Sequence, residues 1–385
     1  MGCFRARAFY LGVSAALAGF AAVAGSVAAP ASANELVPPE VLSAAMPGAV
    51  LGVWPIDVAR PGMKAFRVLY RSTDFTDVPV AITGAVLVPD APADGAKPRD
   101  VVAWGHPTTG VVPKCAPTLL PYLVELIQGA DEMVKRGYVV VATDYVGLGT
   151  QGTHPYLVGA SAGRAVLDSV RAARQLEGSN AGNRFALWGH SEGGHAVLFA
   201  GSQASQYAAE LELVGVAASA PPTNLVELFS VEPSTDFGRQ MRAMMVYSWA
   251  HVFNLRLNDM VETRAVADVE AAANECVTLS PPSIDPAFMK VKLVDFPPTR
   301  TIMEGNSPRA LPAGIPVLLT HGADDPVVPP DFSRAYMAKL CSEGARVKLN
   351  LLPGVDHVWI ANKSAPAAVD WMSARFAGEP PPNDC

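Results

Sequence analysis

The sequence predicts an α/β fold: a mostly parallel sheet flanked by helices, with a helical cap inserted between two of the later strands. Short apolar, β-branched runs alternate with longer helical segments from residue 101 to about residue 217, which is typical of parallel strands joined by crossover helices. The alternation stops over residues 221–312 and resumes at residue 315. The chain has 385 residues, 50% of them hydrophobic, and can therefore bury a large core.

The first 33 residues have the features of a signal peptide. Arg5 and Arg7 form a short basic region, residues 8–29 are apolar and rich in alanine, and Ala31-Ser32-Ala33 fits a small-x-small cleavage site. We therefore expect a secreted protein that begins at Asn34, and an association with the cell envelope stays open. A membrane anchor is the alternative, because the apolar stretch is long enough to span a bilayer, whereas no later stretch is.

The mature chain is predicted to begin with an arm and an antiparallel pair of strands. Residues 34–60 are proline-rich and are expected to lie as an arm on the domain. Residues 66–72 and 78–88 are predicted as two strands, joined by a polar turn at 73–77. Further strands are expected at 101–104, 138–143, 185–188, 213–217, 315–320 and 347–352, with helices at 119–136, 160–176, from the turn at 191 to about 209, 332–340 and 366–376.

This pattern divides the mature chain into three segments. Residues 34–220 and 313–385 form the two parts of the core, and residues 221–312 form the helical cap. Within the cap, large apolar side chains recur at helical spacing and either pack the interior of the cap or face the substrate cleft. These side chains are Met241, Met244, Met245, Trp249 and Phe253.

The charge balance restricts the range of partners. The chain has 29 Lys and Arg against 36 Asp and Glu, so its formal net charge is −7. No basic run occurs beyond the extreme N-terminus. This argues against a nucleic-acid partner and is compatible with a neutral or apolar substrate.

The stretch 185–200 carries the strongest chemical signal. It is predicted as a strand, a sharp turn and a helix, and the turn contains Gly189-x-Ser191-x-Gly193, the nucleophile elbow of the α/β-hydrolase fold. When a strand reverses into a helix within one residue, the positions two before and two after the serine nearly touch, so both favour glycine. The turn exposes the Ser191 hydroxyl to a cleft. The N–H of Glu192, at the helix N-terminus, is the predicted first donor to an oxyanion.

A serine hydroxyl is a weak nucleophile and needs a positioned base, for which His357 is the candidate. The chain has seven histidines. In α/β hydrolases the order along the chain is nucleophile, acid and histidine, and only His357 follows both a candidate acid and a late strand. His190 and His195 lie on the fixed turn and on the helix after it. No pair of histidines has metal-ligand spacing, so no metal site is predicted.

The acid is predicted in the turn that follows the strand at 315–320. A buried carboxylate there would accept the imidazole N–H, fix its tautomer and stabilise the imidazolium. Asp325, directly before Pro326 and three residues after Gly322, is the preferred candidate. Asp324 is the alternative, and it could instead cap the turn.

A second oxyanion donor is expected from the small, turn-rich loop at residues 104–110. Its backbone N–H groups can approach a substrate closely, and Thr109 and Gly110 are the candidates. The alternative is a loop with no role in the chemistry.

Of the five cysteines, Cys3 leaves with the signal peptide. The remaining four are Cys115, Cys276, Cys341 and Cys385. An even number of cysteines in an exported chain predicts two disulfides, and the residues alone leave all three pairings open.

Further motifs accompany the elbow over most of the mature chain. They are Tyr70-Arg71-Ser72-Thr73-Asp74, His106-Pro107-Thr108-Thr109-Gly110 with Cys115-Ala116-Pro117, Thr143-Asp144-Tyr145-x-Gly147-Leu148-Gly149, His154-Pro155-Tyr156, Gly189-His190-Ser191-Glu192-Gly193-Gly194 and Ala220-Pro221-Pro222. In these motifs the chain resembles the secretory lipase family of α/β hydrolases.

The resemblance implies acyl-ester hydrolysis, a helical cap over the site and no cofactor. Ser191 matches the family's nucleophile, Asp325 its acid and His357 its base. The resemblance also implies the disulfide pairing, which joins Cys115 to Cys276 and Cys341 to Cys385.

The resulting hypothesis is a secreted serine lipase or esterase that acts on acylglycerols or similar lipid esters. Its partners would be a lipid or small ester substrate and, through the cap, a transient contact with a lipid interface; the oligomeric state stays open. The alternative is a peptidase or acyltransferase with the same fold, for which Glu262, Asp268 and Glu270 of the cap could bind a substrate amine. A non-enzymatic binding protein is disfavoured, because all three catalytic positions are filled.

Overall fold

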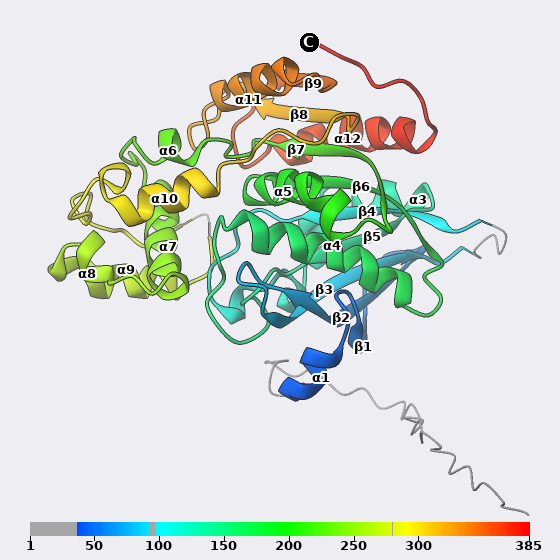
Figure 1. The fold of residues 1–385 in the computed structure, drawn as a ribbon, viewed down its shortest axis with the longest axis horizontal. Coiled ribbons are helices and arrows are strands. Elements are labelled where there is room, and N and C mark those ends of the chain that lie inside the picture. The colour runs from blue at the N-terminus through cyan, green and yellow to red at the C-terminus, as the bar shows by residue number, and fades with distance from the viewer. Residues whose placement is uncertain (1–36, 92–96, 279) are drawn as a thin grey trace, which may run out of the picture. The chain divides into compact units, whose positions relative to one another are not determined.

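A nine-stranded sheet forms the centre of the computed structural model, which describes residues 37–91, 97–278 and 280–385 (Figure 1). The predicted signal peptide, residues 1–33, lies outside the described residues. The strand order is β1-β2-β3-β5-β4-β6-β7-β8-β9. The neighbouring pairs β1–β2, β2–β3 and β3–β5 are antiparallel. The remaining neighbouring pairs, β5–β4, β4–β6, β6–β7, β7–β8 and β8–β9, are parallel. The prediction of a mostly parallel sheet flanked by helices is confirmed.

The bounds of the elements agree closely with the predicted alternation. The strands are β1 (Val50–Ile56), β2 (Met63–Thr73), β3 (Pro79–Pro89), β4 (Arg99–Gly105), β5 (Val139–Thr143), β6 (Ala181–His190), β7 (Glu212–Ser219), β8 (Val317–Gly322) and β9 (Val347–Leu352). The α-helices are α1 (Pro39–Ala44), α2 (Leu123–Leu126), α3 (Ala130–Lys135), α4 (Gly159–Gln175), α5 (Glu192–Tyr207), α6 (Leu225–Leu228), α7 (Asp236–Val252), α8 (Leu257–Met260), α9 (Val266–Ala273), α10 (Pro297–Gly305), α11 (Asp331–Ser342) and α12 (Ile360–Phe376).

Helices cover both faces of the sheet, and the side chains of each strand point alternately to one face and to the other. On β4, Val101 and Ala103 join the apolar cluster that includes α4, α5 and α11, whereas Val102 and Trp104 join the cluster that includes α2, α3 and α12. This alternation is the period-two pattern of a strand whose two faces are both buried. In the described part of the chain, no helix has both the length and the apolar character needed to cross a membrane.

The segment predicted as an arm, residues 34–60, contains a strand of the sheet that was not predicted. Residues 50–56 form β1, an edge strand whose Val53 pairs with Val68 of β2. Gly52 and Pro55 lie inside β1, and both residues are depleted in strands. An edge strand tolerates them because one side of it carries no neighbouring strand.

Two helix predictions also need correction. The single helix expected over residues 119–136 is divided into α2 and α3, because Gly129 adopts a left-handed conformation, with φ of 83°, at the start of α3. The last helix begins at Ile360 rather than at Pro366, which lies within it. Pro366 is exposed, so its ring and its missing N–H fall on the solvent side of the helix.

The cap segment, residues 221–312, lies in sequence between the neighbouring parallel strands β7 and β8 and contains α6 to α10. Its interior is an apolar cluster that includes Met244, Met245 and Trp249 of α7, together with Tyr156 and Leu157 from the loop between β5 and α4. Packing in the interior is therefore confirmed for these three cap side chains. The cap and the core also belong to one compact unit.

Candidate active site

The turn between β6 and α5 has the strained geometry that the glycine spacing predicts. Ser191 has φ of 54° and ψ of −118°, a positive φ that is unusual for a side chain with a Cβ. A Cβ built on Gly189 would overlap the carbonyl group of Gly193, and one on Gly193 would overlap the carbonyl oxygen of Gly105. The Ser191 N–H donates to the carbonyl oxygen of Ser219 at 2.8 Å, which ties the turn to β7.

The structure brings together the three side chains predicted to carry the chemistry. The Ser191 Oγ and His357 Nε2 lie 2.8 Å apart, and His357 Nδ1 lies 2.6 Å from Asp325 Oδ2. Since Asp325 accepts the Nδ1 hydrogen, Nε2 of the neutral imidazole can accept the serine hydroxyl hydrogen. The loops after β8 and β9 supply Asp325 and His357, and both residues are buried.

The Asp325 carboxylate is held on both of its oxygens. Its Oδ1 accepts the N–H groups of Val327 and Val328 at 2.8 and 2.9 Å, and its Oδ2 also lies 3.2 Å from Nε2 of the buried His321. Burial alone would raise the pKa of Asp325, but the hydrogen bonds from His321 and His357 outweigh it, so the pKa lies well below its usual range. The carboxylate is therefore ionised at neutral pH.

Two histidines beside the serine serve as hydrogen-bond donors inside the fold. His190 Nε2 donates to the backbone oxygen of His357 at 2.9 Å, and His195 Nε2 donates to that of Asn306 at 2.7 Å. Burial lowers the pKa of His190 to about 3, with a contribution from the charge of His357, and burial lowers the pKa of His195 to about 4. Both rings are therefore neutral at neutral pH.

The predicted oxyanion donors do not all lie at the cavity beside Ser191. Glu192 lines that cavity, as does Thr108, whereas Thr109 and Gly110 are not among the lining residues that the structure describes. The Thr109 carbonyl accepts the Val277 N–H at 2.9 Å, and a Cβ on Gly110 would lie 2.5 Å from Cys115 Sγ. These two residues pack instead where the loop meets the disulfide and the cap segment.

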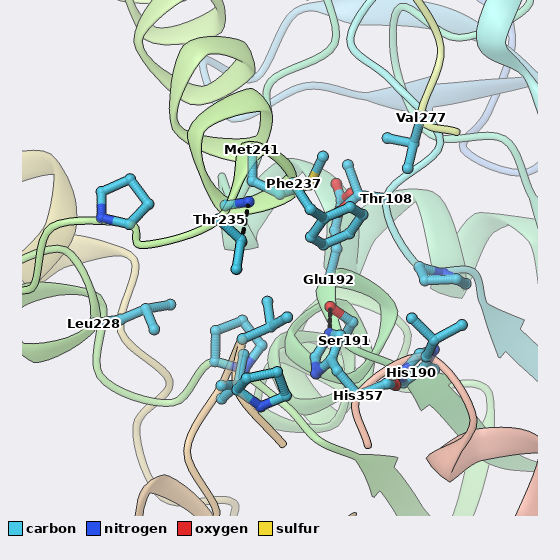
Figure 2. A pocket seen from close by; sticks show the side chains of 18 of the residues that line it. Thr108, His190, Ser191, Glu192, Leu228, Thr235, Phe237, Met241, Val277 and His357 are labelled. Carbon is cyan, nitrogen blue, oxygen red and sulfur yellow. Dashed lines mark hydrogen bonds between the residues drawn. The ribbon is translucent and has the colours of Figure 1, made fainter. Parts of the chain in front are cut away.

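The cavity has a volume of about 900 Å³ and lies between core loops and the cap segment (Figure 2). Ser191 and His357 lie on one side of it, and Thr108, Phe237 and Met241 face them from the other. Met241 is thus the member of the cap's methionine series that reaches the cavity. Other apolar lining residues are Leu126, Leu157, Leu228, Phe229, Val231, Val277, Val327, Val328, Phe332, Val358 and Trp359.

The exposed carboxylates that line the cavity are Glu125, Glu227, Glu232 and Asp331, and each is bonded to another protein group; Asp331 pairs with Arg334 at 3.3 Å. Glu125 pairs with Arg60 at 2.8 Å, and Glu232 pairs with Arg242 at 2.8 Å. Glu227 accepts a hydrogen bond from its neighbour Asn224. Among the described residues, no group of three or more His, Cys, Asp or Glu side chains is placed to hold a metal ion.

Two disulfides are present, with the pairing that the resemblance implies. Cys115 bonds to Cys276, and Cys341 bonds to Cys385. The first links the loop that follows β4 to the cap segment, and the second links α11 to the end of the chain.

Comparison with protein families decides the relationship. A model described as secretory lipase matches residues 126–284 and 296–384, which is more than half of the chain. The chain belongs to the secretory lipase family. It is therefore a hydrolase of the lipase and carboxylesterase class, and its family implies lipid ester substrates.

Curated relatives and solved structures agree with this assignment. The chain is 27% identical to Lipase 10 of Candida albicans, over 90% of its own length and 81% of the relative's. It is 24% identical to Lipase A of Moesziomyces aphidis, over 79% and 70% of the two chains. The crystal structure of Candida antarctica lipase A in its closed state superposes with a TM-score of 0.76 at 20% identity, over 89% of this chain and 85% of that one, and shows the same fold.

Two residues near the site were not predicted from the sequence. His321 was assigned no role, although it opens the His321-Gly322-Ala323-Asp324-Asp325 turn that carries the acid. His154 was assigned none either, yet its Nε2 lies 2.6 Å from Glu192 Oε1. In each case the histidine belongs to a sequence motif described above, and this was the feature that could have indicated a role.

Proposed function

We propose that this chain is an exported serine hydrolase that cleaves lipid esters through Ser191, His357 and Asp325 and a covalent acyl-enzyme. The observation that carries the proposal is the unbroken hydrogen-bonded series from Ser191 Oγ through both imidazole nitrogens of His357 to Asp325. Ser191, the first member of this series, lies on a strained turn beside a largely apolar cavity, where it would meet an acyl chain.

The chemistry follows from these contacts. His357 Nε2 takes the hydroxyl proton as Ser191 Oγ attacks the ester carbonyl carbon, and Asp325 stabilises the imidazolium that forms. His357 then gives this proton to the alkoxide oxygen, the bond from carbon to that oxygen breaks, and the alcohol leaves an acyl group on Oγ. In the second half, His357 Nε2 takes a proton from water as the water oxygen attacks the acyl carbon. The bond from that carbon to Oγ then breaks, His357 gives the proton to Oγ, and the carboxylic acid leaves.

The oxyanion of each tetrahedral intermediate needs donors that are free in the resting protein. We assign this role to the backbone N–H groups of Glu192 and Thr108. Both residues line the cavity, and among the described residues neither N–H has a hydrogen-bond partner. Glu192 also begins α5, so the helix dipole favours negative charge at its N–H. Thr108 replaces Thr109 and Gly110 as the candidate for the second donor.

The cavity supports an ester substrate over a peptide. None of the cap carboxylates considered as amine ligands, which are Glu262, Asp268 and Glu270, is among the described lining residues. The cap carboxylates that do line the cavity, Glu227 and Glu232, are bonded to Asn224 and Arg242.

Export is part of the proposal. It is supported by the signal-like first 33 residues, by the description of the family as secretory and by two disulfides, which persist in oxidising compartments.

A transient contact with lipid surfaces is also proposed, and it would extend beyond the cap. Four large, exposed hydrophobic residues line the mouth of the cavity, and only one of them, Val231, belongs to the cap segment. The other three are Tyr122, Val358 and Trp359 of the core. Exposed apolar groups around a substrate opening are typical of a surface that binds an apolar partner.

The test is a comparison of wild-type protein with S191A on a series of nitrophenyl esters of increasing acyl length and on aminoacyl amides. We expect wild type to hydrolyse the esters and S191A to lose at least about 10³-fold in kcat. A fluorophosphonate should label wild type and not S191A. S202A is the matched control, since Ser202 lies on the same helix and its hydroxyl bonds to the carbonyl oxygen of Phe199.

Equal hydrolysis by wild type and S191A would refute the proposal. Hydrolysis of amides in preference to esters would replace the ester assignment with the peptidase alternative.

A further inference from the structure

A buried pair of ionisable side chains lies directly behind the proposed nucleophile. Glu192 Oε1 and His154 Nε2 are 2.6 Å apart, and the two residues are only 2% and 1% exposed. The proposed mechanism uses the backbone of Glu192 and leaves its side chain without a role. Burying an acid and a base costs desolvation energy, which an apolar pair of the same size would not incur.

The hydrogen bonds of His154 fix how many protons the pair holds. Its Nδ1 lies 2.9 Å from the carbonyl oxygen of Val146, so Nδ1 must carry a hydrogen. One further proton must then lie between Nε2 and Glu192 Oε1, because two bare acceptors would repel each other at 2.6 Å. Whether that proton belongs to an imidazolium or to a carboxylic acid, the pair as a whole is neutral.

The backbone of His154 anchors one short segment to both sides of the cavity. The His154 N–H donates to the carbonyl oxygen of Val111 in the loop after β4 at 3.0 Å, and the His154 carbonyl oxygen accepts the hydroxyl of Ser248, on α7 of the cap, at 2.6 Å. Two residues further on, the Tyr156 hydroxyl lies 3.0 Å from Thr108 Oγ1. The residues of both proposed oxyanion donors, Glu192 and Thr108, are thus held by side chains of residues 154–156.

Aromatic packing keeps the His154 ring in place. The ring of Tyr145 stacks on it with an interplanar angle of 19°, and the Tyr145 hydroxyl donates to the carbonyl oxygen of His106, in the same loop as Thr108. Burial raises the pKa of Tyr156, and the nearby Glu192 carboxylate raises it further, so the phenol keeps its hydrogen over the working range of pH. The contact between Tyr156 and Thr108 therefore persists at any pH at which the protein is assayed.

We infer that Glu192 and His154 form a positioning pair for the oxyanion site. The pair holds the residues of the two N–H donors in place. Its shared proton also neutralises the Glu192 carboxylate, which would otherwise oppose the negative charge that develops on the oxyanion. This inference rests on the proposed function. The electrostatic part follows from position, because Glu192 directly follows Ser191 and lines the same cavity, and its buried carboxyl group belongs to the residue whose backbone N–H is a proposed donor. Without the proton that it shares with His154, the Glu192 carboxylate would raise the energy of the oxyanion more than that of the neutral ester.

The experiment is a double-mutant cycle of H154A, E192Q and E192Q/H154A, assayed on a nitrophenyl ester at pH 8. H154A leaves the carboxylate without its partner, and we expect kcat to fall by roughly 10²-fold with little change in KM, the size of effect seen when one oxyanion donor is removed. E192Q keeps a neutral, hydrogen-bonding side chain and should lose less. The double variant, which lacks the carboxylate, should regain about tenfold over H154A.

Binding of an alkyl boronic acid, which forms a tetrahedral adduct with a serine, should weaken in parallel with kcat. H251A and E304Q are the matched controls, because both residues are exposed and neither lines the cavity in the described structure. The controls should change kcat by less than about twofold. If H154A does not fold, H154N and E192Q/H154N take its place.

A double variant no more active than the His154 variant alone would overturn the inference, since a role in packing alone predicts added damage and no rescue. A fall in affinity for substrate with kcat retained would overturn it as well. Failure of the wild-type protein to hydrolyse any ester would instead refute the proposed function, so the two failures are distinguishable.

Discussion

His190 Nε2 donates a hydrogen bond of 2.9 Å to the backbone carbonyl oxygen of His357, and the centroids of the two rings lie 5.1 Å apart. The elbow is therefore bonded to the backbone of the very residue whose side chain reaches back to Ser191. Since burial holds the pKa of His190 near 3, its ring stays a neutral donor over the whole range in which an esterase is assayed.

We expect H190A to lower kcat by about tenfold, because the backbone at His357 loses its tether and the imidazole is held less precisely. H190Q retains an N–H donor and should lose less. Steady-state kinetics on a soluble ester, with melting temperatures for both variants, check this. Identical kinetics for the two variants would show that the hydrogen bond does not matter.

Replacing Asp325 by asparagine should be far more damaging. An amide that donates toward Nδ1 favours the wrong tautomer of His357, and the expected loss in kcat is about 10³–10⁴-fold with KM little changed. The rate of labelling by a fluorophosphonate should fall by a similar factor. D324N, at the alternative acid, is the matched control, and a larger loss in D324N than in D325N would reverse the assignment.

Stability toward acid should depend on His195. Its folded pKa of about 4 lies below the ordinary value of 6.5, so between these values the unfolded chain binds a proton that the folded protein does not. The contribution of neutral His195 to the stability of the fold is therefore fully present above pH 6.5 and is lost as the pH falls toward 4. In H195N, urea unfolding at pH 7 and pH 5 should differ by less than in wild type, whereas the exposed variant H251A should keep the wild-type difference.

The two disulfides should differ in their effect on activity. Removing either as a pair of serines is expected to cost about 2–5 kcal/mol of stability, since both close long loops, of 161 and 44 residues. Loss of the bond between Cys115 and Cys276 should also lower kcat/KM, because it fixes the loop that follows Thr108. Denaturant unfolding and ester kinetics test this, and equal activity in the two double variants would contradict it.

Contact with a lipid surface should depend on the exposed apolar residues at the cavity mouth. In V358S/W359S we expect hydrolysis of an emulsified ester to fall several-fold, while turnover of a soluble short-chain ester changes by less than about twofold. V53S, at an exposed valine of β1 far along the sheet from the site, serves as the control. A uniform fall on both substrates would point to damage to the cavity instead.

Those parts of the fold whose signal is local could be predicted from the sequence. The apolar face of α4 and the continuous β-branched run of β5 indicate their structures without reference to the rest of the chain. The edge strand β1 could not be recognised, because its half-exposed residues and its Pro55 become a strand only when β2 lies beside them.

The candidate site shows the same division. Ser191, Asp325 and His357 could be nominated because each follows a strand in the order that the fold requires, and the structure places them within hydrogen-bonding distance. The sequence pointed to Thr109 and Gly110 of the loop, whereas Thr108 is the one of the three that lines the cavity, because the sequence does not indicate which peptide of a tight loop turns toward the cavity. The partnership of His154 with Glu192 joins residues 38 apart and has no periodic signature.

The bond between Cys115 and Cys276 encloses Ser191 in a covalent ring, and Asp325 and His357 lie outside it. The second bond closes its own ring at the C-terminal end, from Cys341 to Cys385. One proteolytic cut between residues 277 and 324 would thus yield two internally cross-linked fragments with no covalent link between them, one bearing the hydroxyl and the other the imidazole and carboxylate. The two fragments could be mixed to test whether they reassemble, and recovery of ester hydrolysis would measure their association.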